Sequence, residues 1–413
     1  MEQENLVLCF KSRQKFHDCA EIRVAHAFQV TRTNEKNRTP IRNIGLMLEP
    51  LSGYASGILE GISRFVQRKP DWRIAYFDRE RKELAELLAT WEGDAIICTV
   101  VDPRFHEAAL GRRIPIINVA GLIDEMEIPT VLSDDEAIGR MAAEHFIGRG
   151  FNEFAFLSRR DGGQYANDRG TGFRKRISEV GGTFRPLTIS MSGGDAELRE
   201  KLAKLPRPLA LFASLDRLGA MAIEACWKAG YEVPGEIAVL GAGNHSQLCE
   251  LCSPSLSSVE ADMVRRGYEA AALLDRILAG EAPPREPVRV PPAHVMERKS
   301  TDAYAFGDED VVAALRFIRE HAHQTIKGRD VVAATKLSRR SLEGRFNTLV
   351  GRTLHEEIWR VHFDLAKRLL SSSDLDLQEV AERSGFRSAS ALVNLFRQRL
   401  GVTPRTFRLT NRR

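Results

Sequence analysis

The sequence lacks any apolar run approaching the ~20 residues that a helix needs to span a bilayer. Its first sixteen residues, MEQENLVLCFKSRQKF, lack the basic segment and long apolar stretch of a secretion signal. It has only six cysteines in 413 residues, too few for a disulfide scaffold. We therefore expect a cytoplasmic protein with reduced cysteines.

A large net charge is also absent, but the small net charge of +4 conceals an asymmetry. Residues 1–309 hold 40 basic and 45 acidic side chains, whereas residues 310–413 hold 20 and 11. Such a basic module on a mildly acidic body is typical of nucleic-acid binding, although many basic faces are simply solvated. The length predicts two to four domains, and the composition is that of an ordinary globular protein.

Short apolar runs alternate with helical patterns from residue 41 to about residue 300, which predicts two doubly wound layers of parallel sheet. The strand-like runs include Ile44–Leu48, Ala95–Cys98, Pro115–Val119, Glu153–Leu157, Leu209–Ala213 and Ile237–Leu240. Residues 1–40 are mixed and polar, and we expect a poorly ordered extension there. Residues 301–307 are polar and predict a linker.

Residues 308–413 show no strand pattern and predict about seven helices. Two stretches, 331–346 and 377–396, share one pattern: a short apolar helix, a turn, and a second helix that opens with polar residues. Ser338 and Ser388 are suited to cap the second helices. Two such units, joined by an amphipathic helix at 354–370, indicate a double helix-turn-helix.

The polar residues of the two second helices are the candidates for DNA contact. Arginine can pair with guanine and asparagine with adenine in the major groove, and further arginines can bind phosphates. The candidates are Arg339, Arg340, Ser341, Arg345, Arg387, Ser388, Ser390, Asn394 and Arg397. The alternative is that these are the ordinary polar faces of a small helical bundle.

The basic segment resembles the AraC-type DNA-binding domain. The resemblance rests on residues 360–370 (RVHFDLAKRLL), 380–386 (VAERSGF) and 396–404 (FRQRLGVTP). It implies a regulator that binds promoter or operator DNA through two recognition helices in successive segments of the major groove. Ala391 departs from the family, which usually has an aromatic residue there, and local repacking would account for the difference.

The acidic body is similar to the periplasmic-binding-protein fold of LacI-type repressors. The resemblance rests on residues 44–48 (IGLML), 133–135 (SDD), 169–173 (RGTGF), 213–216 (ASLD) and 241–244 (GAGN). A LacI-like sensor joined to an AraC-type domain resembles the xylose-operon regulators, the XylR family. This implies a ligand-binding domain at 41–300 and a DNA-binding domain at 308–413.

By this resemblance, the candidate effector-binding residues are Tyr54, Asp134, Asp135, Arg169, Asp216 and Asn244. A sugar such as xylose needs several fixed polar partners, since an unpaired hydroxyl in a dry cleft is costly. Arg169 supplies several donors, and Asp216 can accept from paired hydroxyls. Each of the six can instead be an ordinary cap or turn residue. Gly243 stands where relatives usually carry an aspartate, which leaves two alternatives: the ligand differs from xylose, or Asn244 takes that role.

The interpretation is therefore a small-molecule-controlled transcription regulator, expected to be a homodimer without cofactor, metal site or enzymatic activity. Two alternatives remain: a sugar-modifying enzyme built on the α/β body, and a constitutive architectural DNA binder. The enzyme would need a phosphate loop or metal cluster, and no such motif is evident. Cys249 and Cys252 form a lone CxxC, for which a structural role is expected. The effector's identity, the operator and the sign of regulation are not encoded in these patterns.

Overall fold

The computed structural model describes residues 41–48, 53–77, 86–88, 90–100, 103–121, 127–160, 162–190 and 194–411. The expected extension at 1–40 lies outside the described residues. The chain divides into two compact units, residues 1–41 and residues 42–413, and the description below concerns the second unit. No helix among the described residues is long and apolar enough to cross a membrane.

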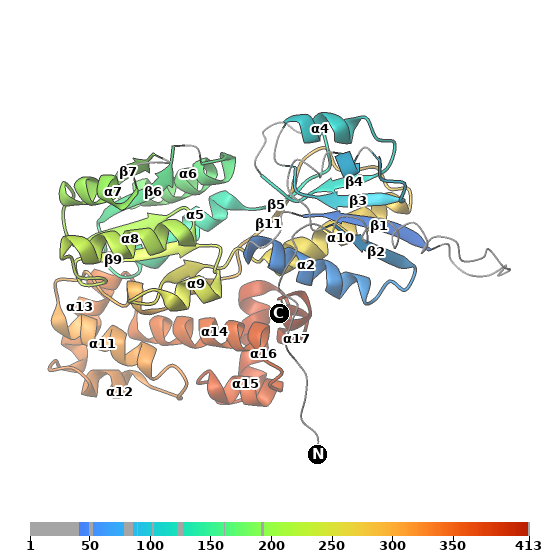
Figure 1. The fold of residues 1–413 in the computed structure, drawn as a ribbon. Helices are drawn as coiled ribbons and strands as arrows, with labels where there is room; N and C mark the ends of the chain where they lie inside the picture. Colours follow the sequence, from blue (N-terminus) through green and yellow to red (C-terminus); the bar gives the residue numbers. More distant parts are fainter. Residues whose placement is uncertain are drawn as a thin grey trace, which may run out of the picture. The chain divides into compact units, whose positions relative to one another are not determined.

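The first sheet forms the centre of a layer that we call lobe 1. Its strands are β1 (Arg42–Met47), β2 (Trp72–Tyr76), β3 (Ala95–Cys98) and β4 (Ile116–Asn118), parallel in the order β2-β1-β3-β4. Helices α2 (Gly53–Val66), α4 (Pro103–Leu110) and α10 (Met263–Leu278) flank it (Figure 1). A side chain at Gly61 of α2 would collide with the Val264 carbonyl of α10, so glycine permits the close packing of these two helices.

The second sheet, with its helices, forms lobe 2. Its six strands run in the order β12-β10-β9-β8-β6-β7, all parallel except the edge strand β12. The strands are β6 (Glu153–Arg159), β7 (Thr183–Ile189), β8 (Leu209–Ala213), β9 (Ile237–Ala242), β10 (Ser257–Val259) and β12 (Val295–Met296). The helices are α5 (Asp135–Ile147), α6 (Gln164–Glu179), α7 (Gly194–Ala203), α8 (Asp216–Ala229) and α9 (Ser246–Leu251).

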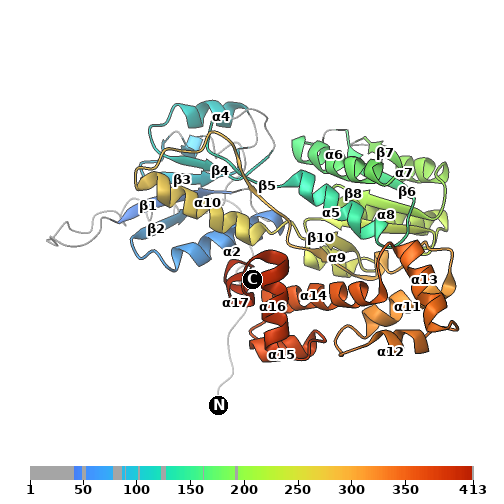
Figure 2. The ribbon, with the colours of Figure 1, turned by 180° about the vertical axis from the view of Figure 1, so that it is seen from behind.

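Alternation along β6 explains why helices cover both faces of the second sheet. Phe154 and Phe156 point to the face packed by α5 and α6, whereas Ala155 and Leu157 point to the face packed by α7 and α8. Figure 1 shows α8 in front of this sheet, and Figure 2, from behind, shows α5 and α6 on the opposite face. Both faces are therefore buried, as in doubly wound folds.

Three passages of the chain connect the lobes. The chain leaves β4 of lobe 1 for β5 (Val131–Ser133) and α5, returns after β10 to α10, and passes back through β11 (Val288–Val290) to β12. Strands β5 and β11 pair in parallel as a two-stranded ribbon. Arg266 of α10 is buried and donates to the Val131 carbonyl of β5 (2.9 Å), so the helix is fastened to this ribbon.

Residues 308–411 form a helical domain without a described strand. Its helices are α11 (Glu309–Glu320), α12 (Gly328–Ala333), α13 (Arg339–Val350), α14 (Leu354–Ser372), α15 (Leu377–Arg383), α16 (Ala389–Leu400) and α17 (Pro404–Asn411). Leu342 and Phe346 of α13 are buried in one core, and Leu392 and Phe396 of α16 in another. The long helix α14 contributes to both cores, so it joins the two helix-turn-helix units.

The predicted fold class is confirmed: two lobes built on mostly parallel sheets are followed by a domain of helices. The predicted cap residues also have that role. Ser338 accepts a hydrogen bond from the backbone N–H of Ser341 (3.3 Å), and Ser388 accepts one from Ala391 (3.2 Å).

The segment expected to be a linker begins inside the core of lobe 2. Ser300 and Thr301 belong to the 3₁₀ turn η1 (Lys299–Thr301) and are almost fully buried. Thr301 donates to Ser257 of β10 (2.8 Å), and Ala305 donates through its backbone to the Arg149 carbonyl at the end of α5 (2.8 Å). Most of this segment is therefore held against lobe 2.

Candidate effector site and candidate DNA interface

The candidate effector residues of lobe 2 follow the carboxyl ends of parallel strands. Asp135 opens α5 just after β5, Asp216 opens α8 just after β8, and Asn244 follows β9. Ligands of open α/β sheets bind at this edge, where successive strand–helix turns converge. The local cause is the same each time: a polar residue is favoured where a buried strand ends and a helix begins.

Asp135 and Arg169 form a buried ion pair. The Arg169 Nε lies 2.7 Å from Asp135 Oδ1, and the two side chains are 5% and 10% exposed. A second guanidinium nitrogen donates to the Ser214 carbonyl (2.6 Å), and the guanidinium lies 5.3 Å from the centre of the Tyr165 ring. Such a pair is rigid, because removing either partner would leave a buried charge without compensation.

Two glycines bring this pair together. A side chain at Gly139 of α5 would collide with the Arg169 carbonyl, and one at Gly172 of α6 would collide with the backbone of Glu136. Glycine at both positions lets α5 and α6 pack closely, which positions Arg169 against the first turn of α5.

Asp216 is the centre of a second buried group. Its Oδ1 accepts from the Ser258 hydroxyl (2.5 Å), and its Oδ2 accepts from the backbone N–H of His245 (2.7 Å). Only 4% of the residue is exposed. The carboxylate therefore fastens the start of α8 to β10 and to the turn before α9.

Asn244 belongs to the same polar group and connects it to residues near the C-terminal end of the sensor domain. Its backbone has φ +52°, a left-handed conformation that asparagine tolerates better than most residues. Its side-chain nitrogen donates to Glu260 (2.7 Å), and its side-chain oxygen accepts from Arg298 (3.0 Å). Both ends of the amide are thus engaged within the protein.

The remaining two candidates differ in what the structure describes. Asp134 is the N-cap of α5 and accepts from the backbone N–H of Ala137 (3.0 Å), so capping explains its presence. Tyr54 belongs to α2, but its side chain lies outside the described part of the chain. Sequence reasoning missed Ser258, Glu260 and Arg298, because they lie on other elements and become partners only through the fold.

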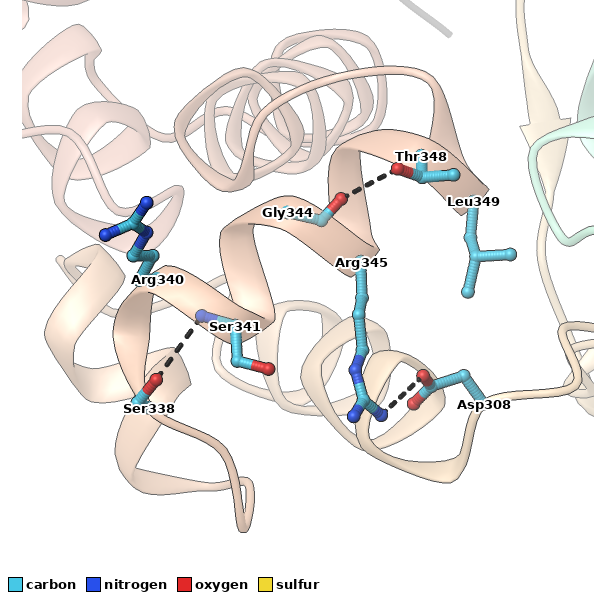
Figure 3. Close-up of a pocket in the computed structure, with 8 residues that line it drawn as sticks. All are labelled: Asp308, Ser338, Arg340, Ser341, Gly344, Arg345, Thr348 and Leu349. Atoms are coloured by element: carbon cyan, nitrogen blue, oxygen red, sulfur yellow. Dashed lines mark hydrogen bonds and ion pairs between the residues drawn. The ribbon is translucent and has the colours of Figure 1, made fainter.

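The first recognition helix presents a polar face along α13. Ser341, Gly344, Arg345 and Thr348 recur at helical spacing and line a shallow groove of about 810 Å³ together with Asp308, Ser338, Arg340 and Leu349 (Figure 3). Gly344 has open space where a side chain would stand, so the helix backbone is accessible there. Gly344 and Thr348 were not predicted, although their spacing from Ser341 could have indicated them.

Two of the predicted arginines on α13 are held by carboxylates. Arg345 pairs with Asp308, the N-cap of α11 (3.1 Å), and Figure 3 shows its side chain reaching across to that residue. Arg339 pairs with Glu343 one turn away (2.8 Å). Both remain largely exposed, so the pairs orient the guanidinium groups without removing them from solvent.

The second recognition helix repeats this arrangement. Ser390, Asn394 and Arg397 are exposed on α16 at spacings of four and three residues, which places them on one face. Arg387, in the turn before the helix, is exposed as well. Ala391 is partly buried against the second core. All nine predicted DNA-contact residues therefore lie in or just before α13 and α16.

A charged junction connects lobe 2 with the helical domain. Glu297 pairs with Arg149 at the end of α5 (2.9 Å) and with Arg319 of α11 (3.4 Å). Burial alone would raise the pKa of the Glu297 carboxyl, but Arg149 and Arg319 hold it well below its ordinary value. A glutamate just after the last strand of the sensor thus joins one arginine from each domain.

Residues 143–301 match the family model described as a periplasmic binding protein-like domain, and residues 331–410 match a helix-turn-helix domain. The first match covers most of lobe 2 together with α10 of lobe 1, and the second covers the helical domain from within α12 to α17. The fold, the two recognition helices and these matches define a DNA-binding transcription regulator that is controlled by a ligand.

More specifically, the chain is homologous along most of its length to regulators of one operon type. The xylose operon regulatory protein of Escherichia coli K12 is 28% identical over 386 residues, which cover 90% of this chain and 98% of that protein. The protein of the same name from Haemophilus influenzae Rd is 27% identical, and the match covers 89% of this chain and 98% of that protein. The solved structure of the xylose-binding transcription activator xylR shares 27% identity over 90% of this chain and 99% of that chain, with a TM-score of 0.57. The resemblance predicted from the sequence is confirmed.

Proposed function

We propose that the effector is a sugar, xylose or a closely related pentose, which binds between the lobes at the carboxyl-terminal edge of the second sheet. The observation that carries this proposal is the polar set at that edge, with Asp135–Arg169 on one side and Asp216 on the other. The relatives that match nearly the whole chain are regulators of xylose operons, which supports the same ligand class.

The chemistry of this edge suits a polyhydroxylated ligand. Carboxylates accept hydrogen bonds from hydroxyl groups, and a guanidinium donates several in a fixed plane. A sugar would take over some of the hydrogen bonds that Arg169, Asp216 and Asn244 now make within the protein. The proposed contacts remain Tyr54, Asp134, Asp135, Arg169, Asp216 and Asn244.

The proposed readout is occupancy of DNA by the two recognition helices. Ser390 and Asn394 on α16 and Arg340 on α13 are exposed, and Ser341 on α13 is half-buried. All four are suited to base edges in the major groove. Arg339, Arg345, Arg387 and Arg397 are suited to phosphates or bases, and the Ser388 cap lies at the start of α16. We propose a homodimer as the functional unit, because two linked domains gain effective concentration on paired half-sites.

Sugar binding would reach the DNA-binding domain through the junction at Glu297. Closure of the lobes would change the surroundings of α5, and Arg149, which pairs with Glu297, lies two residues after the end of α5. The ligand then shifts the population of domain arrangements by its differential affinity for them. Regulation, rather than conversion of the sugar, is the proposed activity.

The test combines thermal shift with DNA binding on the full chain. Xylose, other pentoses and hexoses are titrated while the melting temperature is recorded, because a ligand of the folded state raises it. DNA selected from a random pool is then used in gel shifts with and without xylose. We expect a saturable melting shift with xylose or a related pentose, and a sugar-dependent change in DNA affinity.

Asp216→Asn is the informative variant, since it keeps the shape of the side chain and one acceptor oxygen. The sugar concentration needed to produce half of the melting shift should rise at least about tenfold, as expected for the loss of a charge-assisted hydrogen bond. Lys204→Ala, an exposed change in the turn after α7, is the control and should respond as wild type. A full response in Asp216→Asn would remove that residue from the site, and chromatographic detection of a converted sugar would favour an enzyme.

A further inference from the structure

A second cavity lies between lobe 2 and the DNA-binding domain, apart from every candidate effector residue. It encloses about 490 Å³. One wall comes from the end of α5 and residues 293–297, with Arg176 of α6, and the other from the end of α13 and from α14. This volume falls within the range of pockets that hold small metabolites.

The walls carry a marked excess of positive charge. Six cationic side chains line the cavity: Arg149, Arg176, Arg352, Arg360, Lys367 and Arg368. Three carboxylates line it as well: Glu144, Glu297 and Asp364. Behind the walls, Glu357 pairs with both Arg352 and Arg360, and Glu179 pairs with Arg176 and with Arg140. The lining cations still outnumber the carboxylates, so the walls keep a positive excess.

The excess is concentrated on the wall formed by α14. Asp364 is shared between Lys367 (2.8 Å) and Arg360 (3.3 Å), so one carboxylate serves two cations. Arg368, the next residue, makes no ion pair with any residue that the structure describes. It is only partly exposed, which makes an uncompensated charge costly there.

The opposite wall carries two arginines and two carboxylates, Glu144 and Glu297, so its charges are nearly balanced. Arg149 is 4% exposed and points toward Glu297, and Arg176 comes from the neighbouring helix α6. Burial, with the nearby Arg149, lowers the pKa of His145 well below its ordinary value, so its ring adds no charge near neutral pH. The cationic groups therefore come from both domains and surround one space.

We propose that this cavity binds a small phosphorylated anion, either free phosphate or the phosphate group of a metabolite. A phosphomonoester carries about two negative charges near neutral pH, so it would offset the positive excess on the walls. Arginine and lysine are the side chains that recognise phosphate oxygens, arginine through paired N–H groups. The space exceeds that of phosphate alone, which leaves room for an attached sugar or similar group.

Because both domains line the cavity, the anion would bridge them. Binding would stabilise the arrangement in which α14 lies against α5, and would disfavour any arrangement that opens this contact. The chain would thereby respond to a second, charged signal in addition to the neutral effector. This inference concerns residues that the proposed sugar site does not use, so either can fail alone.

The experiment uses the full chain in a buffer free of phosphate and sulfate. Inorganic phosphate, glucose 6-phosphate, glucose and sulfate are titrated separately, with thermal shift and calorimetry as readouts. We expect saturable binding of inorganic phosphate, glucose 6-phosphate or both, and none of glucose. Tighter binding of glucose 6-phosphate than of phosphate would identify the source as a metabolite, and the reverse would identify free phosphate.

Variants on α14 decide whether binding occurs in this cavity. Arg368→Ala should weaken binding by about tenfold or more, whereas Arg368→Lys should retain most of it, because the charge remains. The control Lys204→Ala makes the same change in net charge outside the cavity and should bind as wild type. The melting temperature of each variant without ligand shows whether it folds. If Arg368→Ala folds poorly, Lys367→Ala takes its place in the binding experiment.

Three results would overturn the proposal. The first is the absence of saturable binding by any phosphorylated probe up to about 10 mM. The second is an unchanged affinity in both Arg368→Ala and Lys367→Ala, and the third is equal binding of sulfate in wild type and both variants. Either of the last two would show that the anion binds elsewhere.

Discussion

The candidate residues of the sensor and those of the DNA-binding domain have opposite environments. Arg169 is 4% exposed and paired with Asp135, while the side chain of Arg339 is 71% exposed. In the sensor, the polar groups complete the fold and would exchange partners with a ligand. In the DNA-binding domain most of them lie on the surface, where phosphates and base edges would approach from solvent. Under the proposed function, the sensor residues would serve stability and binding together, whereas most of the DNA residues would serve binding alone.

Arg169→Ala tests this contrast with the largest expected effect. It should lower the free energy of unfolding by about 3–5 kcal/mol, because Asp135 would be left as a buried, unpaired charge. Arg340→Ala, on the exposed face of α13, should change it by no more than about 0.5 kcal/mol. Urea denaturation followed by circular dichroism measures both. Equal stabilities for the two variants would contradict the contrast.

Asn394→Ala tests the other half of the contrast. We expect specific DNA affinity to fall by about 1–3 kcal/mol, roughly 5- to 150-fold, through loss of a base contact, without a change in melting temperature. Fluorescence anisotropy on the selected DNA gives the affinity, with Lys204→Ala as the control. An unchanged affinity would exclude Asn394 from the base contacts.

The sensor and the DNA-binding domain each contain a buried neutral histidine, so in their response to pH the two domains should behave alike. Burial lowers the pKa of His145, assisted by Arg149, and lowers that of His362 to about 4. Below pH 6.5 the unfolded chain takes up protons that the folded chain refuses, so stability falls as the pH drops. Each histidine contributes a slope of up to about 1.4 kcal/mol per pH unit.

Denaturation at pH 7.5, 6.5 and 5.5 measures these slopes. His145→Gln and His362→Gln should each show a shallower loss of stability than wild type between pH 6.5 and 5.5. The charge of Glu297 does not interfere, because its lowered pKa confines its effect to the range below about 4.5. A slope that neither substitution changes would mean that both rings accept protons in the folded chain.

The smallest expected effect separates phosphate contacts from base contacts within the DNA-binding domain. Arg397→Ala should weaken DNA binding modestly for all sequences and reduce the salt dependence by about one unit in the log–log slope. Asn394→Ala should leave that slope unchanged. Titrations between 50 and 200 mM salt compare the two, and identical slopes for Arg397→Ala and wild type would assign Arg397 another role.

Sequence patterns predicted the long, strongly apolar elements well, and the short or mixed ones poorly. Strand β3 was predicted with its observed bounds, since four consecutive buried residues leave little choice. Strands β5 (VLS) and β10 (SSV) were missed because each is short and interrupted by serine, whereas the equally short β4 lies in a longer apolar run. Strand β7 was missed because it lies at the sheet edge, contains Pro186 and is partly exposed.

The two candidate sites differ in the same way. The DNA face follows from helical spacing, which is local, so Ser390, Asn394 and Arg397 could be placed on one side of a helix in advance. The Asp135–Arg169 pair joins residues 34 positions apart and depends on how closely α5 and α6 pack. The glycines that permit this packing give no sign of it in the sequence.

The hydrogen bond between Ala305 and the end of α5 has a consequence for operator geometry. While it holds, only Gly307 and the first residue after it are free to stretch before α11, a reach of about 7 Å. A larger displacement of the two recognition helices would first require residues 305 and 306 to detach from the sensor. The tolerated distances between half-sites would then fall into discrete steps, one with this segment attached and another with it released.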